Sequence, residues 1–230
     1  MSPSTSPALM FAAGFGTRMK ALTRDRPKPL VEVAGRPLID YALDLARDAG
    51  CDPIVANLHY KSEMLVQHLE PRGVKTVVES PDILETGGGL RNALPVLGSD
   101  PVMTVNTDAI WEGPNPLTFL SEAWDAEKMD ALLILIPKEN AKGHTGKRDF
   151  ILTETGRIRR GDDFIYGGVQ ITKTDRLHEI EEVAFSLNRL WDQMLADERL
   201  FGLCYPGRWC DVGSPDGIPL AENLLEQSDV

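Results

Sequence analysis

The amino-acid sequence predicts an α/β fold: a Rossmann-like, mostly parallel sheet flanked by helices, with a small antiparallel insertion. Three observations lead to this prediction. Short apolar runs alternate with segments of helical periodicity as far as residue 137, which is typical of parallel strands joined by helices. The first apolar run leads directly into a glycine-rich loop, as expected of a buried strand that ends beside a ligand. Beyond residue 140, β-rich stretches follow one another without a helix between them, which indicates antiparallel pairing.

The first half of the chain contains the parallel sheet. Its first strand covers residues 8–13, and the apolar spacing of residues 37–49 predicts a helix that stops before Gly50. Further strands are expected at residues 53–58, 75–79, 102–106 and 131–137, and further helices at residues 62–69, 90–97 and 116–126.

The second half contains the antiparallel insertion, at about residues 140–172. Thr155-Gly156 is a turn candidate between two β-rich stretches, and a strand follows at residues 164–172. We then expect a helix at 187–195, a strand at 201–205 and a closing helix at 218–227. The chain shows no internal repeat and no low-complexity linker. A single domain over residues 1–230 is therefore predicted, with residues 1–7 as a disordered tail.

Charge and composition exclude several classes of protein. The 24 Lys and Arg residues against 35 Asp and Glu residues give a net charge of −11, which repels polyanions and excludes general nucleic-acid binding. The longest strongly apolar run, residues 131–136, is too short to span a bilayer, and the polar N-terminus lacks a secretory signal. The three cysteines form no CxxC pair, which is typical of free thiols in a reducing compartment. We expect a cytoplasmic protein.

The loop after the first strand, residues 12–19 (AAGFGTRM), is the first chemical feature. Two glycines permit a tight turn whose N–H groups can point at an anion. Met19 stands where a dinucleotide-binding fingerprint needs a third glycine, and the Gly-Lys-Ser/Thr of a P-loop is also missing. Arg18 and Lys28, the latter between two prolines, are suited to neutralising a polyphosphate. The alternative for each residue alone is an ordinary turn with solvated surface charges.

This string, with its continuation Pro27-Lys28-Pro29-Leu30 and Gly35-Arg36-Pro37-Leu38-Ile39, resembles the signature of sugar-phosphate nucleotidyltransferases. The resemblance extends, with lower density, to the end of the chain. It implies the nucleotide-diphospho-sugar transferase type of sheet, a glycine loop that wraps a nucleoside triphosphate, and phosphate stabilisation by Arg18 and Lys28 as catalytic residues. The nucleotide-binding residues that it implies are Ala12, Ala13, Gly14, Gly16, Thr17, Gly88 and Asn106.

A glycine run, Glu85-Thr86-Gly87-Gly88-Gly89, precedes the helix expected at residues 90–97. Glycines at a helix start let a ligand approach the backbone and its free N–H groups; a flexible loop is the alternative. The run resembles the branch of short enzymes around N-acetylmuramate alpha-1-phosphate uridylyltransferase. That resemblance implies that Gly88 contacts the nucleotide base.

Two aspartates are candidate magnesium ligands. Asp108 follows the strand at residues 102–106, where ligands gather in an open α/β sheet, and its carboxylate suits a hard divalent cation; capping of the next element is the alternative. Asp211, in Asp211-Val212-Gly213-Ser214-Pro215, lies 103 residues further on, so sequence spacing cannot pair the two. The resemblance implies that the two aspartates are paired as ligands of one Mg²⁺. Thr107 departs from the glycine common at this place in the family and adds bulk beside the site.

The acceptor side is expected within the insertion. The resemblance places the sugar pocket there, with Gly168 and Asp149 as sugar-binding residues. The basic loop at residues 142–149 (KGHTGKRD) is either a lid over the sugar phosphate or a plain solvated loop. The Glu-Lys-Pro segment of the larger thymidylyl- and glucose-type enzymes is absent, which argues against those branches. The four histidines are expected at the surface or in caps.

The resemblance implies Mg²⁺-dependent transfer from an NTP, with UTP favoured, to a sugar 1-phosphate. N-acetylmuramate 1-phosphate is the favoured acceptor, in a cell-wall recycling step. Mannose 1-phosphate, glucose 1-phosphate and phosphocholine stay open as acceptors. A non-catalytic nucleotide-sugar-binding regulator and a dinucleotide-binding oxidoreductase are the alternatives of another class; a regulator would be expected to have lost Arg18, Lys28, Asp108 or Asp211, and all four are present.

Overall fold

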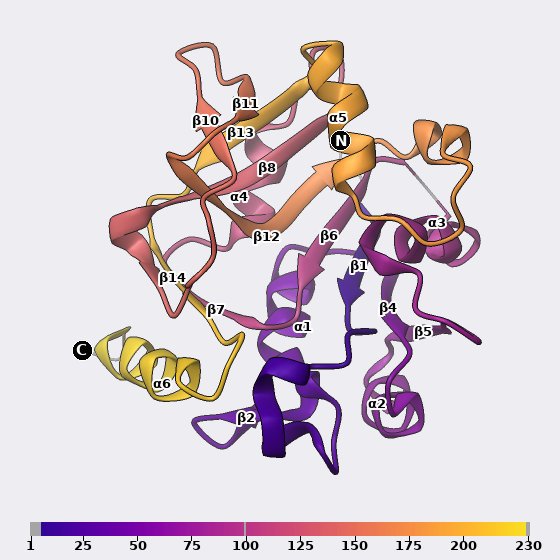
Figure 1. The fold of residues 1–230 in the computed structure, drawn as a ribbon, viewed down its shortest axis with the longest axis vertical. Coiled ribbons are helices and arrows are strands. Elements are labelled where there is room, and N and C mark those ends of the chain that lie inside the picture. The colour runs from indigo at the N-terminus through magenta and orange to yellow at the C-terminus, as the bar shows by residue number, and fades with distance from the viewer. Residues whose placement is uncertain (1–5, 99, 229–230) are drawn as a thin grey trace.

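The computed structural model describes residues 6–98 and 100–228. Its central sheet has nine strands (Figure 1): β1 (Ala8–Phe11), β4 (Ile54–Leu58), β5 (Lys75–Val78), β6 (Val102–Asn106), β8 (Ala131–Pro137), β10 (Phe150–Leu152), β11 (Ile158–Arg160), β12 (Phe164–Thr172) and β13 (Leu200–Cys204). The path runs β11-β10-β12-β6-β1-β4-β5, while β8 pairs with β12 and β13 pairs with β8. Strands β6, β1, β4 and β5 are parallel. This sheet confirms the predicted α/β class.

The antiparallel strands join this sheet rather than lying beside it. Strand β12 runs antiparallel both to β6 and to β8. Its residues from Gly167 to Thr172 are all buried, so the strand needs hydrogen-bonding neighbours on both edges. The predicted insertion is therefore a continuation of the main sheet, with β10 and β11 at its edge.

Two small sheets accompany the large one. The first combines β7 (Ala109–Glu112), β14 (Arg208–Asp211) and β9 (Ala141–Lys142), and the second combines β2 (Glu32–Val33) and β3 (Arg36–Pro37). None of these strands exceeds four residues, which is too short for a clear alternation of apolar and polar residues. The sequence prediction accordingly lacks them.

Helices cover both faces of the large sheet. They are α1 (Leu38–Asp48), α2 (Ser62–Leu69), α3 (Glu85–Leu97), α4 (Pro116–Ala123), α5 (Asn188–Ala196) and α6 (Gly217–Ser228). Five 3₁₀ turns connect the elements: η1 (Thr17–Thr23), η2 (Lys28–Leu30), η3 (Glu70–Arg72), η4 (Lys138–Asn140) and η5 (Asp175–Glu179). Among the described residues, no helix is both long and apolar enough to cross a membrane.

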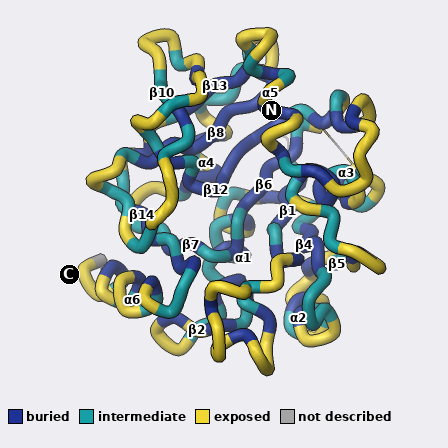
Figure 2. Tube along the Cα trace, in the orientation of Figure 1, coloured by how far each residue is buried: buried dark blue, intermediate teal, exposed yellow. Residues whose placement is uncertain are grey.

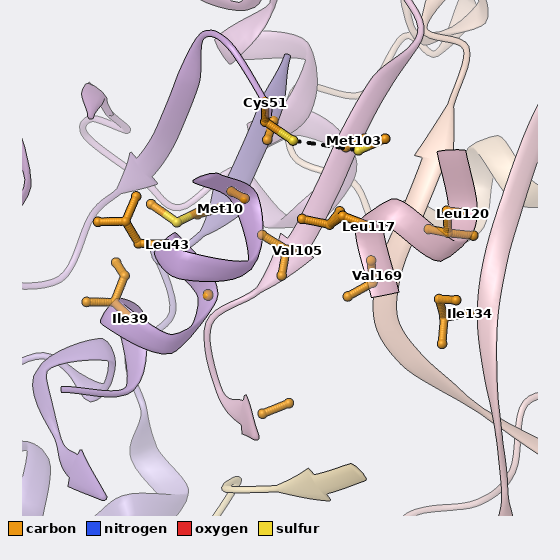
Figure 3. Packing of buried hydrophobic residues seen from close by; sticks show 14 of the residues in the cluster. Met10, Ile39, Leu43, Cys51, Met103, Val105, Leu117, Leu120, Ile134 and Val169 are labelled. Carbon is orange, nitrogen blue, oxygen red and sulfur yellow. Dashed lines mark hydrogen bonds between the residues drawn. The ribbon is translucent and has the colours of Figure 1, made fainter. Parts of the chain in front are cut away.

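Each face of the sheet has its own core, because side chains alternate along a strand. Met10 of β1 packs with Ile39 and Leu43 of α1 on one face (Figure 3), whereas Leu9 packs in a second cluster with Leu90 of α3. Both clusters are formed by buried side chains, and the central strands are buried along almost their whole length (Figure 2). The carboxyl ends of β1, β4 and β6 therefore lie on a rigid scaffold.

Most element boundaries agree with the prediction, and two differences bear on function. The first strand ends at Phe11 rather than at residue 13, and α3 begins at Glu85, so the glycine run forms its first turns. The predicted tail falls mainly on residues 1–5, outside the described part of the chain. Ser6 and Pro7 accept hydrogen bonds at their carbonyls from the N–H groups of Asp52 and Met103.

Candidate active site

A cavity of about 310 Å³ lies at the carboxyl ends of β1, β4 and β6, the edge where ligands bind in open α/β sheets. The predicted site residues that line it are Ala12, Ala13, Gly14, Gly16, Thr17, Arg18, Lys28, Asn106 and Asp108. The other lining residues are Phe11, Pro29, Asn57, Ile83, Glu85, Thr86, Thr107 and Gly213. Segments far apart in the sequence thus meet around one space.

The glycine loop is folded tightly where it meets Lys28. Gly16 has φ +64°, and a Cβ at this position would lie 2.7 Å from Cβ of Lys28. The carbonyl of Gly16 accepts a hydrogen bond from Oγ1 of Thr23 at 3.1 Å. Gly14 differs, because a Cβ there would have no atom within 4 Å. Gly16 therefore serves the close packing of the loop, and Gly14 faces open space at the cavity.

Lys28 forms an ion pair inside the cavity. Its Nζ lies 2.6 Å from Oδ2 of Asp108, and only 12% of the lysine side chain is exposed. The segment before it is extended at Pro27, which aims the following side chain toward the sheet edge. A cation is thus held between the glycine loop and the end of β6.

Asp108 and Asp211 are brought together by the pairing of β7 with β14. Asp211 pairs with Ala109 in the antiparallel register, and the N–H of Val212 donates to the carbonyl of Asp108 at 2.8 Å. Burial raises the pKa of Asp211, and the charge of Asp108 raises it further, against the lowering effect of Lys28, Arg18 and His144. Two carboxylates from distant parts of the sequence therefore interact electrostatically in one site.

Arg18 reaches the same place because residue 213 has no side chain. A Cβ at Gly213 would lie 2.8 Å from Nη1 of Arg18 and 2.9 Å from Oδ1 of Asp211. The guanidinium and the carboxylate thus both pack against this glycine. The structure brings the four predicted charged residues, Arg18, Lys28, Asp108 and Asp211, into one cluster.

Thr107 lines the cavity, and its side chain is bound to the end of β1. Its Oγ1 donates to the carbonyl of Phe11 at 2.8 Å, and the residue is 4% exposed. The hydroxyl therefore ties the end of β6 to the end of β1. The Thr107 side chain, which was expected to add bulk beside the metal site, thus connects two strands at the edge of the sheet.

Four predicted residues do not line the cavity: Asp211, which lies beside it, and three that contact other protein groups, Gly168, Asp149 and Gly88. Gly168 has φ +85°, and a Cβ there would lie 2.7 Å from Nδ2 of Asn106. Oδ2 of Asp149 accepts a hydrogen bond from the N–H of Tyr166 at 2.9 Å. The N–H of Gly88 donates to the carbonyl of Phe185 at 3.0 Å.

The glycine run serves helix packing. Gly87 and Gly88 both donate to the carbonyl of Phe185, so their N–H groups are already used. A Cβ at Gly87 would lie 2.4 Å from the Phe185 ring, and one at Gly88 would lie 2.5 Å from the carbonyl oxygen of Val183. The prediction that this run precedes the helix is wrong, because α3 begins at Glu85. Close packing against residues 183–185 requires Gly87 and Gly88.

His144 was not predicted to lie at the site. Its Nδ1 is 3.8 Å from Oδ2 of Asp211. Gly143, with φ +69°, lets the loop lie against the backbone, since a Cβ there would be 2.3 Å from the Asp211 carbonyl oxygen. The polarity and the glycines of residues 142–149 were visible in the sequence, but nothing there relates them to Asp211.

The donor set fits a magnesium ion. Mg²⁺ is bound in proteins by one or two carboxylates together with substrate phosphates, and Asp108 with Asp211 provides such a pair. No group of three or more His, Cys, Asp or Glu side chains that could hold a metal occurs among the described residues. The pair thus suits a cation that arrives with a phosphate ligand rather than one enclosed by protein alone.

Comparison with known proteins identifies the family. The model of the MobA-like NTP transferase domain matches residues 8–156. N-acetylmuramate alpha-1-phosphate uridylyltransferase of Caulobacter vibrioides is 37% identical, with 99% of this chain and 100% of the relative covered, and its namesake in Neisseria meningitidis serogroup B is 32% identical over 94% and 97%. Mannose-1-phosphate guanyltransferase of Pichia angusta is 30% identical, but the chain spans 60% of its length.

Solved structures agree in fold. HddC from Yersinia pseudotuberculosis, complexed with GMP-PN, matches with a TM-score of 0.75 at 20% identity, covering 96% of this chain and all of the other. A putative glucose-1-phosphate thymidylyltransferase from Bacillus anthracis matches with a TM-score of 0.80 at 16% identity, over 98% and 96%. The chain belongs to the MobA-like NTP transferase family and, within it, to the sugar-1-phosphate nucleotidyltransferases.

Proposed function

We propose that this enzyme joins UTP to N-acetylmuramate 1-phosphate in a Mg²⁺-dependent reaction that gives the UDP-sugar and pyrophosphate. The observation that carries the proposal is the clustering of four charged residues: Arg18, Lys28 and Asp108 line one cavity, and Asp211 lies directly beside them. Two relatives named for this reaction match the chain over nearly its whole length. The reaction would be a cytoplasmic step that recycles a cell-wall sugar.

The chemistry is displacement at the α-phosphorus. A phosphate oxygen of the sugar 1-phosphate forms the new bond to this phosphorus, and the bond to the oxygen that bridges the α- and β-phosphates breaks. Pyrophosphate leaves with that electron pair. The attacking oxygen is already anionic near neutral pH, so the reaction needs no general base. The protein has to orient the two phosphates and stabilise negative charge.

Arg18 and Lys28 can supply that stabilisation. Both are cations that line the cavity, and cations fixed before the reaction stabilise charge that develops in the transition state. Mg²⁺, which Asp108 and Asp211 would hold, neutralises phosphate charge when bound. In the structure Asp108 fixes the Lys28 ammonium at 2.6 Å, so the lysine is placed before a substrate enters.

The loop at residues 142–149 supports an acceptor with an additional negative charge. Lys138, Lys147 and Arg148 line a second cavity of about 320 Å³, which also includes His144 beside Asp211. Arg148 pairs with Asp162, whereas Lys138 and Lys147 have no ion pair within the described part of the chain. N-acetylmuramate carries a carboxylate that mannose and glucose lack. Two unpaired lysines on the acceptor side favour the acidic sugar.

The proposal is tested by measuring pyrophosphate release with four NTPs against a set of acceptors. The acceptors are N-acetylmuramate, N-acetylglucosamine, glucose and mannose 1-phosphates together with phosphocholine, each with Mg²⁺ and with EDTA. We expect the highest kcat/KM for UTP with N-acetylmuramate 1-phosphate, and no release with EDTA. A higher kcat/KM for GTP with mannose 1-phosphate would show that the proposed substrates are wrong. Release from no pair would overturn the proposed function.

A further inference from the structure

A buried polar pair, Asn57 and Glu79, lies at the cavity, which Asn57 lines. Asn57 is in β4, Glu79 directly follows β5, and each residue is 2% exposed. Nδ2 of Asn57 donates to Oε1 of Glu79 at 2.6 Å. In the described part of the chain, Glu79 forms no ion pair with a Lys, Arg or His side chain. Burial of a carboxylate to this extent costs free energy of folding unless hydrogen bonds satisfy it. The hydrogen bonds of Glu79 therefore indicate its structural role.

The other contacts of the pair lead to the two walls of the cavity. The N–H of Ala12, in the glycine loop, donates hydrogen bonds at 3.2 Å both to Oδ1 of Asn57 and to the backbone carbonyl of the same residue. Oε2 of Glu79 accepts one from the N–H of Leu84 at 2.7 Å, one residue before α3. Ala12 lines the cavity on one side, and the neighbours of Leu84, Ile83 and Glu85, line it on the other.

The chain of hydrogen bonds therefore runs from one wall through both side chains to the other. Asn57 lies in β4, and the other three residues directly follow β1, directly follow β5 and directly precede α3, elements that are neighbours in the fold (Figure 1). Gly89 makes room for the pair: a Cβ there would lie 2.6 Å from Oε1 of Glu79 and 2.7 Å from Nδ2 of Asn57. The third glycine of the run thus exists for this contact.

We propose that Asn57 and Glu79 are positioning residues that fix the separation between the glycine loop and the start of α3, and thereby set the affinity for the nucleotide. The inference rests on the proposed function, in that the cavity is taken as the nucleotide site. Neither residue takes part in the chemical step. Both act through the backbone N–H groups of Ala12 and Leu84.

The hydrogen-bond pattern allows a test by exchange. In Asn57→Asp, two carboxylates face each other. In Glu79→Gln, an amide N–H₂ must face either the amide of Asn57 or the N–H of Leu84, and both are donors. In the double variant, the new carboxylate at position 57 accepts from Ala12 and from the new amide at position 79, whose oxygen accepts from Leu84. Each single variant breaks a contact, and the double variant restores every donor and acceptor.

We would measure the Kd of UTP by calorimetry without acceptor, the KM values of UTP and acceptor, and the midpoint of thermal unfolding. Each single variant is expected to weaken UTP binding by about tenfold, as loss of a buried hydrogen bond does. The KM of the acceptor should change by less than about twofold, because the acceptor does not contact this wall. Exposed Glu70→Gln, whose carboxylate accepts a hydrogen bond from Thr76, is the matched control and should bind UTP normally.

Recovery of UTP affinity in the double variant is the expected result. A double variant as weak as the sum of the singles, or equal changes for UTP and acceptor, would overturn the inference. A wild-type chain that binds UTP but releases no pyrophosphate would contradict the proposed function alone, since nucleotide affinity still tests the pair. A wild-type chain that binds no nucleotide would overturn both.

Discussion

Asp108 and Asp211 show at the scale of single residues how the fold makes a site. The residues next to each aspartate in the sequence do not predict its contact with the other, because 103 positions separate the two. Four-residue strands β7 and β14 place them on adjacent backbones. Besides burial, the charge of Asp108 raises the pKa of Asp211, as expected of two like charges held close together.

Replacement of either aspartate by asparagine is therefore expected to abolish most activity. We predict that Asp108→Asn and Asp211→Asn each lower kcat by roughly two orders of magnitude or more, because amide oxygens bind a divalent cation more weakly than carboxylates. Pyrophosphate release measures the rate, and circular dichroism with thermal unfolding checks the fold. Exposed Asp192→Asn, which removes only a surface pair with Arg160, is the control. Normal turnover in either active-site variant would remove that aspartate from the metal site.

Single glycines also have roles that residue type alone does not reveal. Gly14 borders open space at the cavity, whereas Gly16, Gly168 and Gly213 each exist because another side chain occupies the space of their Cβ. A glycine near a site thus either leaves space for a ligand or makes room for another part of the protein. The distinction depends on which side chain folds back onto them, and that is a tertiary property.

At the scale of elements, one arginine fixes a whole segment beside α3. Arg91 donates through Nη1 and Nη2 to the carbonyls of Leu177, Ile180, Glu182 and Val183. Its guanidinium also lies 4.7 Å from the centre of the Phe185 ring. Phe185 in turn accepts the N–H groups of the helix start. The segment and the first turn of α3 are therefore held as one unit.

We predict that Arg91→Lys destabilises the protein by about 2 kcal/mol, because a lysine cannot satisfy several carbonyls at once. Urea unfolding measures the loss, and hydrogen exchange should show faster exchange for residues 177–188 than for the central strands. Arg189→Ala is the matched control: it removes an exposed ion pair to Glu182 in the same segment and should cost less than about 0.5 kcal/mol. Equal effects of the two variants would contradict the assigned role of Arg91.

The basic loop is the element that should distinguish acceptors. We predict that Lys147→Ala raises the KM of N-acetylmuramate 1-phosphate by about tenfold, the value of one charge-assisted hydrogen bond. The KM of N-acetylglucosamine 1-phosphate, which has no carboxylate, should stay within about twofold. Lys128→Ala, at an exposed position that pairs with Asp125, is the control for loss of one positive charge. An equal rise for both acceptors would assign the lysine to the shared phosphate instead.

At the scale of the whole molecule, the negative charge does not describe the site. The chain carries a net charge of −11, yet two cations line the cavity at the edge of the sheet. Glu79 and Asp130 are buried, but salt screens the field of the acidic residues at the surface over about 8–10 Å. An acidic protein can thus bind a small polyanion while repelling nucleic acid.

The sequence predicted what local pattern determines. The alternation of elements and the order of residues from 12 to 39 placed the glycine loop, Arg18 and Lys28 at the first strand end, as found. Contacts between distant segments were not predictable: β7 with β14, residues 143–144 with Asp211, and Asn57 with Glu79. These pairings arise because the sheet brings several strand ends to one edge, and no single segment encodes them.

Stability of the whole molecule should depend on pH through Asp130. This aspartate is 8% exposed and lies just before β8, where it pairs with Lys173 after β12 and with Arg199 before β13. Burial opposes its ionisation, but the hydrogen bonds from Arg199 and Lys173 outweigh burial, and its pKa is lowered. Three strand ends of the central sheet are thus joined by one carboxylate.

A lowered pKa in the folded state means that the ionised form is favoured by folding. The stabilisation is complete above the unfolded pKa of about 3.9 and is lost as the pH falls through the lower pKa of the folded state. We predict that Asp130→Asn lowers the free energy of unfolding by about 2 kcal/mol at pH 7. The difference from wild type should shrink as the pH falls below about 4, where the carboxylate first becomes protonated in the unfolded chain and then, at lower pH, in the folded protein. Urea unfolding of both proteins at pH 7 and pH 3 measures it, and a difference that stays constant with pH would show that Asp130 acts through packing rather than charge.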